Sequence, residues 1–551
     1  MAFTAGLVLE VESGGDDTNN GGGFDTGVAG FPTDLAATSG NTSAPVVTSA
    51  SYTFVAGDVG AYVYVKSGTN WTPGWYPINS VSGGAATLGA GIGAATLANG
   101  RLTTVAGCAT VASPSGGTWG LDYSRQTAAQ ITFTDLVIGA TTTQFTSAAH
   151  PVGKNFVGNL VSVTSGTGFT VQRVAVVSTS GTTATCDKSL GTGGSTGGAG
   201  RLGGALATPQ KLDSLGVAGH DSYIKQATYS GTVDVTFSVS GVNGADPCRI
   251  MGYATVRGDQ GRPTIDIIAG NNFDAVTITG AYIEVYDLIA TGHNDGTNRG
   301  AFICGSNPGT AVIRCKSTGL GRSGIPAFRS SGNQAGTRFI ECECVLPNTS
   351  GAAAFSSDNN SFYYGCRATG GGGGNCDGFQ LTAVQTAVMV NCVADTVDGH
   401  AVMTDGVGHR LIDHCVLRNP TTDGIYISAD GRVPTVRNTI IEGCGGKDIN
   451  APSAIATPVT DYCAFFNNAT PINSYGPNDV TLTADPHVNA AGGDLRLNET
   501  AGAGGACRGK GGPRTIPGLT PSNYPDIGLY QADPTLPVPT ILVPGTARAG
   551  T

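Results

Sequence analysis

Three Asp-Gly pairs recur in the second half of the chain, and their carboxylates are the groups best suited to chemistry. The pairs are Asp377-Gly378, Asp398-Gly399 and Asp423-Gly424. Glycosidic cleavage commonly uses two carboxylates that flank the bond, about 5 to 9 Å apart, and adjacent coils of a repetitive fold could supply that distance. Asp377, Asp398 and Asp423 are therefore the candidate catalytic residues.

A turn role competes with this chemistry. Asp-Gly is a common turn pair, because Asp bonds its own backbone and Gly tolerates positive φ. Carboxylates that faced one another would also repel, and would show a raised pKa or a bound Ca²⁺. Asp405, His400 and His409 are nearby in sequence. The spacing of His400, His409 and His414 matches neither a zinc site nor a triad, and no repeated Gly-Gly-x-Gly-x-Asp array is present. We predict no metal and no cofactor.

A column of cysteines indicates how these residues are positioned. A segment of apolar character ends in Cys315, and the same place recurs along the chain at Cys342, Cys366, Cys392, Cys415 and Cys463. Leu288 and Thr439 occupy the place in two further repeats, so that successive intervals are about 23 to 27 residues. We expect small, reduced, packed side chains in one interior column of stacked coils.

A second column runs out of phase with the first. It consists of Gly300, Gly324, Gly351, Gly378, Gly399 and Gly424. Repeats of this length without a helical pattern indicate an all-β parallel β-helix. The composition agrees: 86 of 551 residues are Gly and only 12% are charged, which disfavours helices.

The N-terminal part contains a different repeat. Residues 59–69 match residues 157–167 at an offset of 98, and residues 82–87 match residues 180–185 at the same offset. We therefore predict two copies of a small β module, at 25–118 and 119–204.

Net charge and composition exclude several function classes. The chain has a net charge of −10 and no cluster of Lys or Arg, which argues against nucleic acid as a partner. The first ten residues do not resemble a secretory signal, and no apolar run approaches a membrane span. The cysteines are too sparse for a disulfide scaffold. We expect a protein folded in a cytoplasm, without membrane insertion.

Three segments resemble parts of right-handed parallel β-helix proteins. Residues 9–24 resemble their opening strand and turn, residues 218–229 their first full coil, and residues 526–531 their closing Asp-Ile-Gly-Ala-x-Gln. His220 and Ala227 depart from the usual first-coil pattern. Together with the module endings in Gly-Arg-Leu, this is similar to structural proteins of tailed bacteriophages.

The resemblance implies a cap strand at 1–24, a right-handed β-helix at 205–531 and a tail at 532–551. At about 25 residues per coil, residues 1–24 and 205–531 together predict roughly twelve coils. It also implies a virion surface protein, a tailspike, fibre or related appendage. Such a protein is expected to be a homotrimer, to contact other virion proteins through the modules, and to bind a neutral or weakly charged host-surface glycan.

Two alternatives remain open. One is a polysaccharide lyase or glycoside hydrolase on the same fold, and the other is a bacterial surface adhesin, which the missing signal disfavours. Glycan binding without cleavage would use exposed aromatics such as Tyr363, Tyr364 and Tyr426, although such alternating strand positions are more often core.

Overall fold

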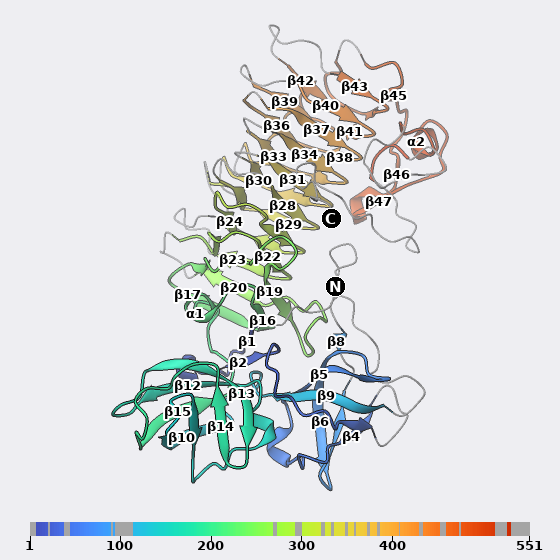
Figure 1. Ribbon diagram of the computed structural model, residues 1–551. Coiled ribbons are helices and arrows are strands. Elements are labelled where there is room, and N and C mark those ends of the chain that lie inside the picture. The colour runs from blue at the N-terminus through green and yellow to red at the C-terminus, as the bar shows by residue number, and fades with distance from the viewer. Residues whose placement is uncertain are drawn as a thin grey trace, which may run out of the picture. The chain divides into compact units, whose positions relative to one another are not determined.

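The computed structural model (Figure 1) describes most of the chain. The described residues are 7–19, 22–37, 44–89, 92–93, 114–267, 273–292, 300–320, 325–331, 336–347, 351–357, 360–371, 375–382, 386–406, 408–428, 433–451, 459–472, 475–512 and 526–529. They form two compact units, the first within residues 1–263 and the second made of residues 230–238 and 264–551 together with residues 98–100. Each unit is described by itself.

The second unit is a parallel β-helix of eight turns, built from three parallel sheets. Its first sheet contains, in spatial order, β22 (Ile283–Tyr286), β25 (Ala311–Ile313), β28 (Thr337–Ile340), β31 (Ser361–Tyr364), β34 (Ala387–Val390), β37 (Arg410–Asp413), β40 (Thr435–Arg437) and β43 (Val459–Asp461). Its second sheet contains β20 (Thr264–Ile267), β23 (Ile289–Gly292), β26 (Lys316–Thr318), β29 (Glu343–Leu346), β32 (Arg367–Gly370), β35 (Val393–Asp395), β38 (Val416–Arg418), β41 (Ile440–Glu442), β44 (Ala464–Phe466) and β45 (Val480–Thr481). Its third sheet contains β18 (Val235–Phe237), β21 (Val276–Ile278), β24 (Phe302–Cys304), β27 (Phe328–Ser330), β30 (Ala353–Ser357), β33 (Asp377–Leu381), β36 (Val402–Thr404), β39 (Ile425–Ile427) and β42 (Ile449–Asn450).

Each turn passes through the three sheets in this order, and identical positions of successive turns stack on one another. Phe302, Phe328, Phe355 and Phe379 pair in register in the third sheet, and their rings stack with centroids 4.8 to 5.1 Å apart. All four side chains are buried. Because strand neighbours alternate between the two faces of a sheet, this interior column fixes which residues point outward.

The predicted cysteine column is confirmed. Each of its six cysteines follows a strand of the first sheet, is fully buried and is unpaired in a disulfide. The thiols of Cys342 and Cys366 each donate to a carbonyl of the preceding turn, that of Val312 or Phe339, at 3.3 Å. Leu288 and Thr439 occupy the same place and are equally buried. The column is therefore a packing feature.

A left-handed residue precedes every member of this column. The residues with positive φ are Asp287, Arg314, Glu341, Gly365, Asn391, His414, Asn438 and Tyr462. One residue in this conformation reverses the side-chain alternation and turns the chain from the first sheet into the second.

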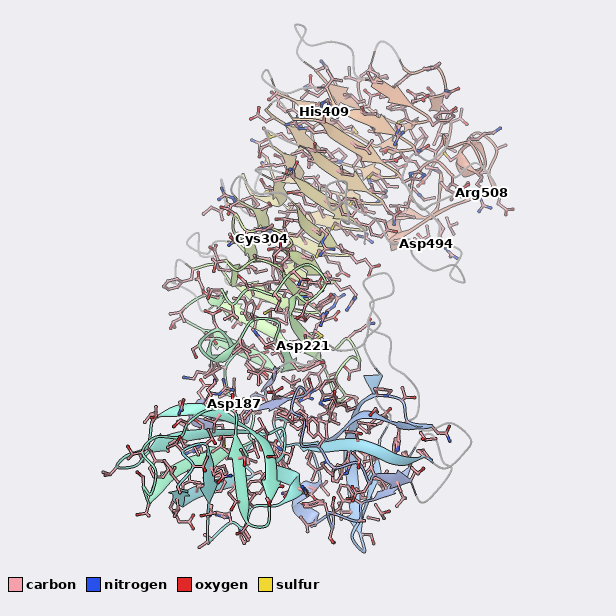
Figure 2. The ribbon with its side chains drawn as sticks, viewed as in Figure 1. Asp187, Asp221, Cys304, His409, Asp494 and Arg508 are labelled. Carbon is pink, nitrogen blue, oxygen red and sulfur yellow. The ribbon has the colours of Figure 1, made fainter. Side chains whose placement is uncertain are left out.

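The last part of the second unit leaves the coil after β45. Its elements are β46 (His487–Asn489), η4 (Ala490–Gly492), β47 (Asp494–Leu497) and α2 (Gly504–Cys507), and β46 pairs antiparallel with β47. Apolar residues of this C-terminal segment form one buried cluster with outward-facing residues of the second sheet. Asp494 and Arg508 mark the segment in Figure 2.

The first unit contains two antiparallel β structures. One is a sheet of β3 (Ala36–Ala37), β4 (Val46–Thr48), β5 (Tyr62–Thr69), β6 (Gly74–Ser82), β7 (Ala85–Leu88), β8 (Ile92–Gly93) and β9 (Ser115–Asp122). The other is a closed barrel of β10 (Ile131–Ile138), β11 (Gln144–Thr146), β12 (Leu160–Ser165), β13 (Gln172–Ser180), β14 (Thr183–Cys186) and β15 (Gly198–Leu202). The 3₁₀ turns η2 (Ala56–Asp58) and η3 (Lys154–Phe156) precede β5 and β12.

The elements of the sheet and of the barrel follow one another at the same sequence intervals. The strands β6 and β13 start 98 residues apart, and so do η2 and η3. In the same way Tyr62 pairs with Pro77 in the sheet, and Leu160 pairs with Ala175 in the barrel. Strand β9 pairs with β5 and extends to Asp122, slightly past the expected module boundary at residue 118.

The first unit also contains strands of parallel type. The opening strand β1 (Leu7–Val11) pairs parallel with β16 (Asp221–Lys225), which pairs parallel with β19 (Cys248–Tyr253). Strand β2 (Gly23–Asp25) pairs antiparallel with β1, and η1 (Asp17–Asn19), α1 (Lys211–Leu215) and β17 (Thr228–Gly231) complete the elements described here.

The expected number of roughly twelve coils refers to residues 1–24 and 205–531. Eight turns belong to the second unit, and β1, β16 and β19 are parallel strands of the first unit. Residues after β45 form the C-terminal segment instead of further coils. Within the described ranges, no helix has the length and apolarity needed to cross a membrane. The predicted tail at 532–551, Gly324, Tyr530 and Gln531 lie outside the described residues.

Candidate functional site

The third sheet brings two of the three candidate aspartates into equivalent positions. Strand register places Asp377, His400, Asp423 and Lys447 one above another on four successive turns. With about 4.8 Å between neighbouring strands, Asp377 and Asp423 stand two turns apart, roughly 10 Å.

Asp398 lies outside this stack. Gly378 and Gly424 are equivalent in register, but the residue between them in the stack is Ala401, two positions after Gly399. Gly300 and Gly351 do not occupy the register position of Gly378 either. The predicted glycine column is therefore wrong in detail. The stacked aromatic rings set the register of this sheet, while the glycines belong to the segments that lead into it.

The expected turn chemistry of the Asp-Gly pairs also needs correction. Gly378, Gly399 and Gly424 do not have positive φ. A Cβ on Gly378 would lie 2.6 Å from the carbonyl oxygen of Ala401, and one on Gly424 would lie 2.5 Å from that of Asp448. These two glycines are therefore required by close packing against the next turn.

The two stacked carboxylates bond the backbone of the following turn. Asp377 accepts a hydrogen bond from the backbone N–H of His400 at 2.9 Å, and Asp423 accepts one from that of Lys447 at 2.8 Å. Each also accepts from a side-chain amide, Gln380 for Asp377 and Asn450 for Asp423, both at 2.9 Å.

His400 lies between the two carboxylates. Its Nδ1 is 3.3 Å from Oδ2 of Asp423 and 2.9 Å from Oγ1 of Thr422. Its ring stacks on Tyr426 with centroids 4.6 Å apart and planes inclined by 13°. The imidazole therefore separates the carboxylates and reduces the repulsion expected between them.

The pKa values of the two carboxyl groups shift in opposite directions. Burial raises the pKa of Asp377, and its hydrogen bonds from Gln380 and His400 only partly offset this. Burial also opposes ionisation of Asp423, but hydrogen bonds from His400, Asn450 and the Lys447 backbone outweigh it and lower the pKa of Asp423. Carboxyl pairs with divergent pKa values can act as acid and base.

An outward-facing surface surrounds these groups, which we call the third-sheet patch. It consists of Gln380, His400, Tyr426 and Asn450, which surround the buried carboxylates of Asp377 and Asp423, in or directly before β33, β36, β39 and β42. Gln380, His400, Tyr426 and Asn450 are half-buried, whereas their strand neighbours Phe379 and Ile425 are fully buried. Amide, carboxylate and imidazole groups thus stand beside one aromatic ring.

The other predicted residues lie elsewhere. Asp398 accepts a hydrogen bond from Oγ1 of Thr421, and Asp405 accepts one from Oγ of Ser428. His409 is exposed in the segment before β37 (Figure 2). Tyr363 is interior, stacked on Phe339, whereas Tyr364 is half-buried on the outward face of the first sheet. Gln380, Thr422 and Asn450 were missed, because their positions follow only from the strand register.

The sequence matches no protein-family model and no curated protein. Several solved structures are similar to it. One is pectate lyase Pel9A, with 16% identity over 59% of this chain and 91% of that chain, and a TM-score of 0.42. Another is the catalytic domain of a GH87 α-1,3-glucanase in complex with nigerose, with 12% identity over 80% and 90% and a TM-score of 0.29. A third is the tailspike gp61 of Pseudomonas phage phi297, with 14% identity over 62% of both chains and a TM-score of 0.21. Similarities at this level carry no information about the function of this chain.

Proposed function

We propose that this chain is a surface protein of a tailed-bacteriophage virion, a tailspike, fibre or related appendage, whose β-helix binds a glycan of the host surface. The third-sheet patch is the observation that carries the binding role. Glycan hydroxyls are neutral donors and acceptors, and a surface that binds them needs fixed polar groups beside an aromatic ring.

The patch is pre-organised for such contacts. Gln380 and Asn450 are held by Asp377 and Asp423, and the Tyr426 ring is held by His400. Little side-chain entropy then remains to be lost on binding. The low charge of the chain and its net charge of −10 favour a neutral or weakly charged glycan over an acidic one.

The virion assignment is supported by the resemblance of residues 9–24, 218–229 and 526–531 to phage structural proteins. A trimer is supported by the outward face of the first sheet. Apolar side chains there stay half-buried on successive turns: Ile340, Phe362, Tyr364, Val388 and Leu411. Side-by-side association of copies would cover this face.

Polysaccharide cleavage is a second candidate function, and the divergent pKa values of Asp377 and Asp423 favour it. The strands that carry them are two turns apart, roughly 10 Å, which is just beyond the separation of about 6.5 to 9.5 Å between two carboxylates that act through an intervening water. In that role Asp377, with its raised pKa, would be the acid, and Asp423 would be the base.

Binding can be tested with a panel of purified bacterial surface polysaccharides and the full-length chain. We expect a neutral member of the panel to bind, and Tyr426→Ala to weaken binding roughly tenfold. Ile303→Ala is the matched control, since Ile303 occupies the same outward column several turns away. No binding to any member, or equal affinities for all three proteins, would contradict the proposal.

Cleavage can be tested on the bound polysaccharide by release of oligosaccharides. Asp377→Asn and Asp423→Asn should abolish release, whereas Asp398→Asn, outside the stack, should retain it. Undiminished release by the first two variants would place the chemistry elsewhere, and no release by the unaltered chain would leave binding alone.

A further inference from the structure

Glu442 is an outward-facing residue of the second sheet that the C-terminal segment encloses. Val416, Ile440 and Ala464 of this sheet belong to one buried cluster with Leu495, Leu497 and Cys507 of the segment. Glu442 lies beside this cluster in β41 and is only 3% exposed. A carboxylate in such a position requires a partner of positive charge.

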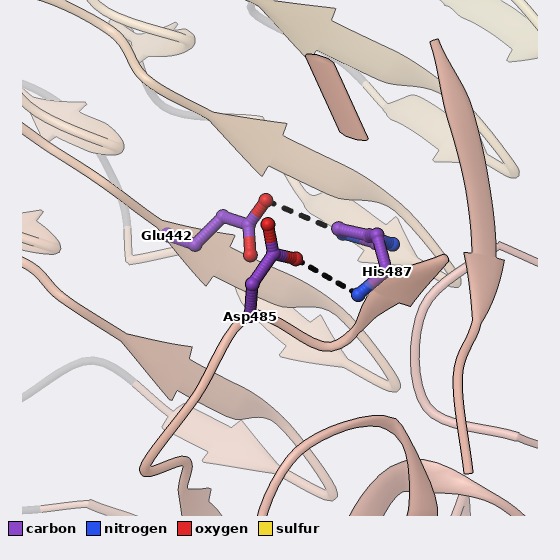
Figure 3. A group of neighbouring side chains, drawn as sticks. All are labelled: Glu442, Asp485 and His487. Carbon is purple, nitrogen blue, oxygen red and sulfur yellow. Dashed lines mark hydrogen bonds and ion pairs between the residues drawn. The ribbon is translucent and has the colours of Figure 1, made fainter. Parts of the chain in front are cut away.

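His487 enters the same enclosed space from the C-terminal segment. The sequence Asp485-Pro486-His487 forms a tight bend in which Oδ1 of Asp485 accepts the backbone N–H of His487 at 2.8 Å. This bend brings the Asp485 carboxylate and the His487 ring to the same side (Figure 3). Asp485 is exposed, whereas His487 is buried.

The tautomer of His487 follows from its second contact. Its Nδ1 lies 2.9 Å from the carbonyl oxygen of Leu495. Since a carbonyl oxygen can only accept, Nδ1 carries a hydrogen, and the lone pair of neutral imidazole is then on Nε2. A carbonyl that orients the ring in this way is typical of a metal-ligating histidine.

The atoms that face one another lack hydrogen-bond partners. Nε2 of His487 and Oε2 of Glu442 are both buried, and neither has a hydrogen bond within the described part of the chain. Nε2 lies 3.3 Å from Oε1 of Glu442. Ligand atoms of Glu442, Asp485 and His487 all lie within 4.8 Å of one another.

The charged groups around Glu442 carry a net negative charge, which a bound cation would neutralise. Arg418 bonds Asp395 at 2.8 Å and Oε1 of Glu442 at 3.2 Å, and Arg367 lies 3.5 Å from Asp395. The carboxylates of Asp395 and Glu442 on the sheet are thus matched by two guanidinium groups, and the exposed Asp485 of the C-terminal segment adds one further negative charge. A neutral His487 adds no charge to this balance.

We propose that Glu442, Asp485 and His487 bind a divalent transition-metal ion, which fastens the C-terminal segment to the second sheet. One imidazole nitrogen and two carboxylate oxygens are a ligand set suited to Zn²⁺, with water in the fourth position. Calcium and magnesium prefer oxygen ligands alone and fit this set less well.

The competing arrangement is a proton in place of the metal, which would make His487 and Glu442 an ion pair. Both arrangements hold the same atoms together, but only one of them depends on added metal. Zn²⁺ titration of the full-length chain therefore distinguishes them, after chelator treatment and dialysis.

We expect one equivalent of Zn²⁺ to bind by calorimetry and to raise the thermal midpoint by several degrees. Co²⁺ in its place should give visible absorption bands. His487→Gln and Asp485→Asn should each weaken binding roughly tenfold or more, while His409→Gln, which replaces an exposed histidine, should leave it unchanged.

Asp485→Asn keeps the test decisive if His487→Gln does not fold, because Asp485 is exposed. Two results would overturn the proposal. One is a thermal midpoint that Zn²⁺ leaves unchanged in the unaltered chain, which assigns the cluster to a protonated ion pair. The other is equal Zn²⁺ affinity in the unaltered chain and in Asp485→Asn.

Discussion

Asp377 and Asp423 occupy equivalent positions two turns apart, yet their carboxyl groups have pKa values displaced in opposite directions. The difference arises from their neighbours. His400, Asn450 and the Lys447 N–H outweigh the burial of Asp423, whereas burial dominates at Asp377. The pKa of an aspartate in this stack therefore depends on which turn of the β-helix holds it.

Cleavage by this pair should have a bell-shaped pH dependence. Activity needs ionised Asp423 and protonated Asp377, so it should fall below the lowered pKa of Asp423 and above the raised pKa of Asp377. The two limbs should lie on either side of 3.8, the ordinary value for Asp. Initial rates of oligosaccharide release against pH measure both limbs. A profile that rises steadily toward alkaline pH would contradict these roles.

Arg257 is a second residue whose role is set by its surroundings. It is fully buried in the first unit and bonds Glu10 at 2.6 Å, Asp122 at 2.8 Å and Oγ of Ser124 at 2.9 Å. It thereby connects β1 with β9, two strands that are far apart in sequence.

Replacing this arginine should be costly. Arg257→Ala leaves two buried carboxylates without their cation and should lower the free energy of unfolding by about 3 to 5 kcal/mol. Denaturant unfolding of the full chain measures the loss. Arg496→Ala, which removes an exposed ion pair with Asp494, should cost much less stability than Arg257→Ala. Equal losses in the two variants would show that the buried network does not stabilise the first unit.

At the scale of elements, one residue with positive φ precedes each member of the cysteine column and turns the chain from the first sheet into the second. We call this position the corner. The position is occupied by seven non-glycine residues, from Asp287 to Tyr462, and by one glycine, Gly365. Asn391 is representative, with a φ of 57°. Only a residue that tolerates this conformation lets the following cysteine point inward.

Asn391→Val should therefore lower the free energy of unfolding by about 1 to 3 kcal/mol, since a β-branched side chain is strained at positive φ. Asn391→Gly is the matched control and should be nearly neutral, because Gly365 holds the same place in the preceding repeat. Urea unfolding of both variants provides the comparison. A Val variant as stable as the Gly variant would contradict the proposed role of the corner.

The elements also show what could be predicted from the sequence. The cysteine column could be predicted because the cysteines recur at nearly constant intervals and each follows apolar strand residues. The corners could not, since Arg314, Glu341 and His414 share no chemical property. Asp377, Asp398 and Asp423 were predicted together, and only the strand register separates Asp398 from the other two, because the lengths of the segments leading into the third sheet vary.

The C-terminal segment was missed for a related reason. Glu442 and His487 belong to different elements and show no metal-ligand spacing, so only the return of the chain onto the second sheet brings them together. Contacts that form when the chain folds back onto an earlier sheet leave no repeat in the sequence from which they could be predicted.

At the scale of the whole molecule, the proposed trimer makes the outward face of the first sheet an interface. Light scattering coupled to size-exclusion chromatography should give three times the mass of one chain. Phe362→Glu should yield monomers, because it places a charge on the apolar face, whereas Ile303→Glu on the third sheet should not. A monomer for the unaltered chain would contradict the trimer and weaken the virion proposal.

A structure of the full-length chain with a bound host-surface oligosaccharide would locate the glycan directly. We expect the sugar to lie over the third-sheet patch, against the Tyr426 ring and within hydrogen-bond distance of Gln380 or Asn450. A sugar bound to another face of the β-helix, or to the first unit, with the patch left free, would contradict this expectation.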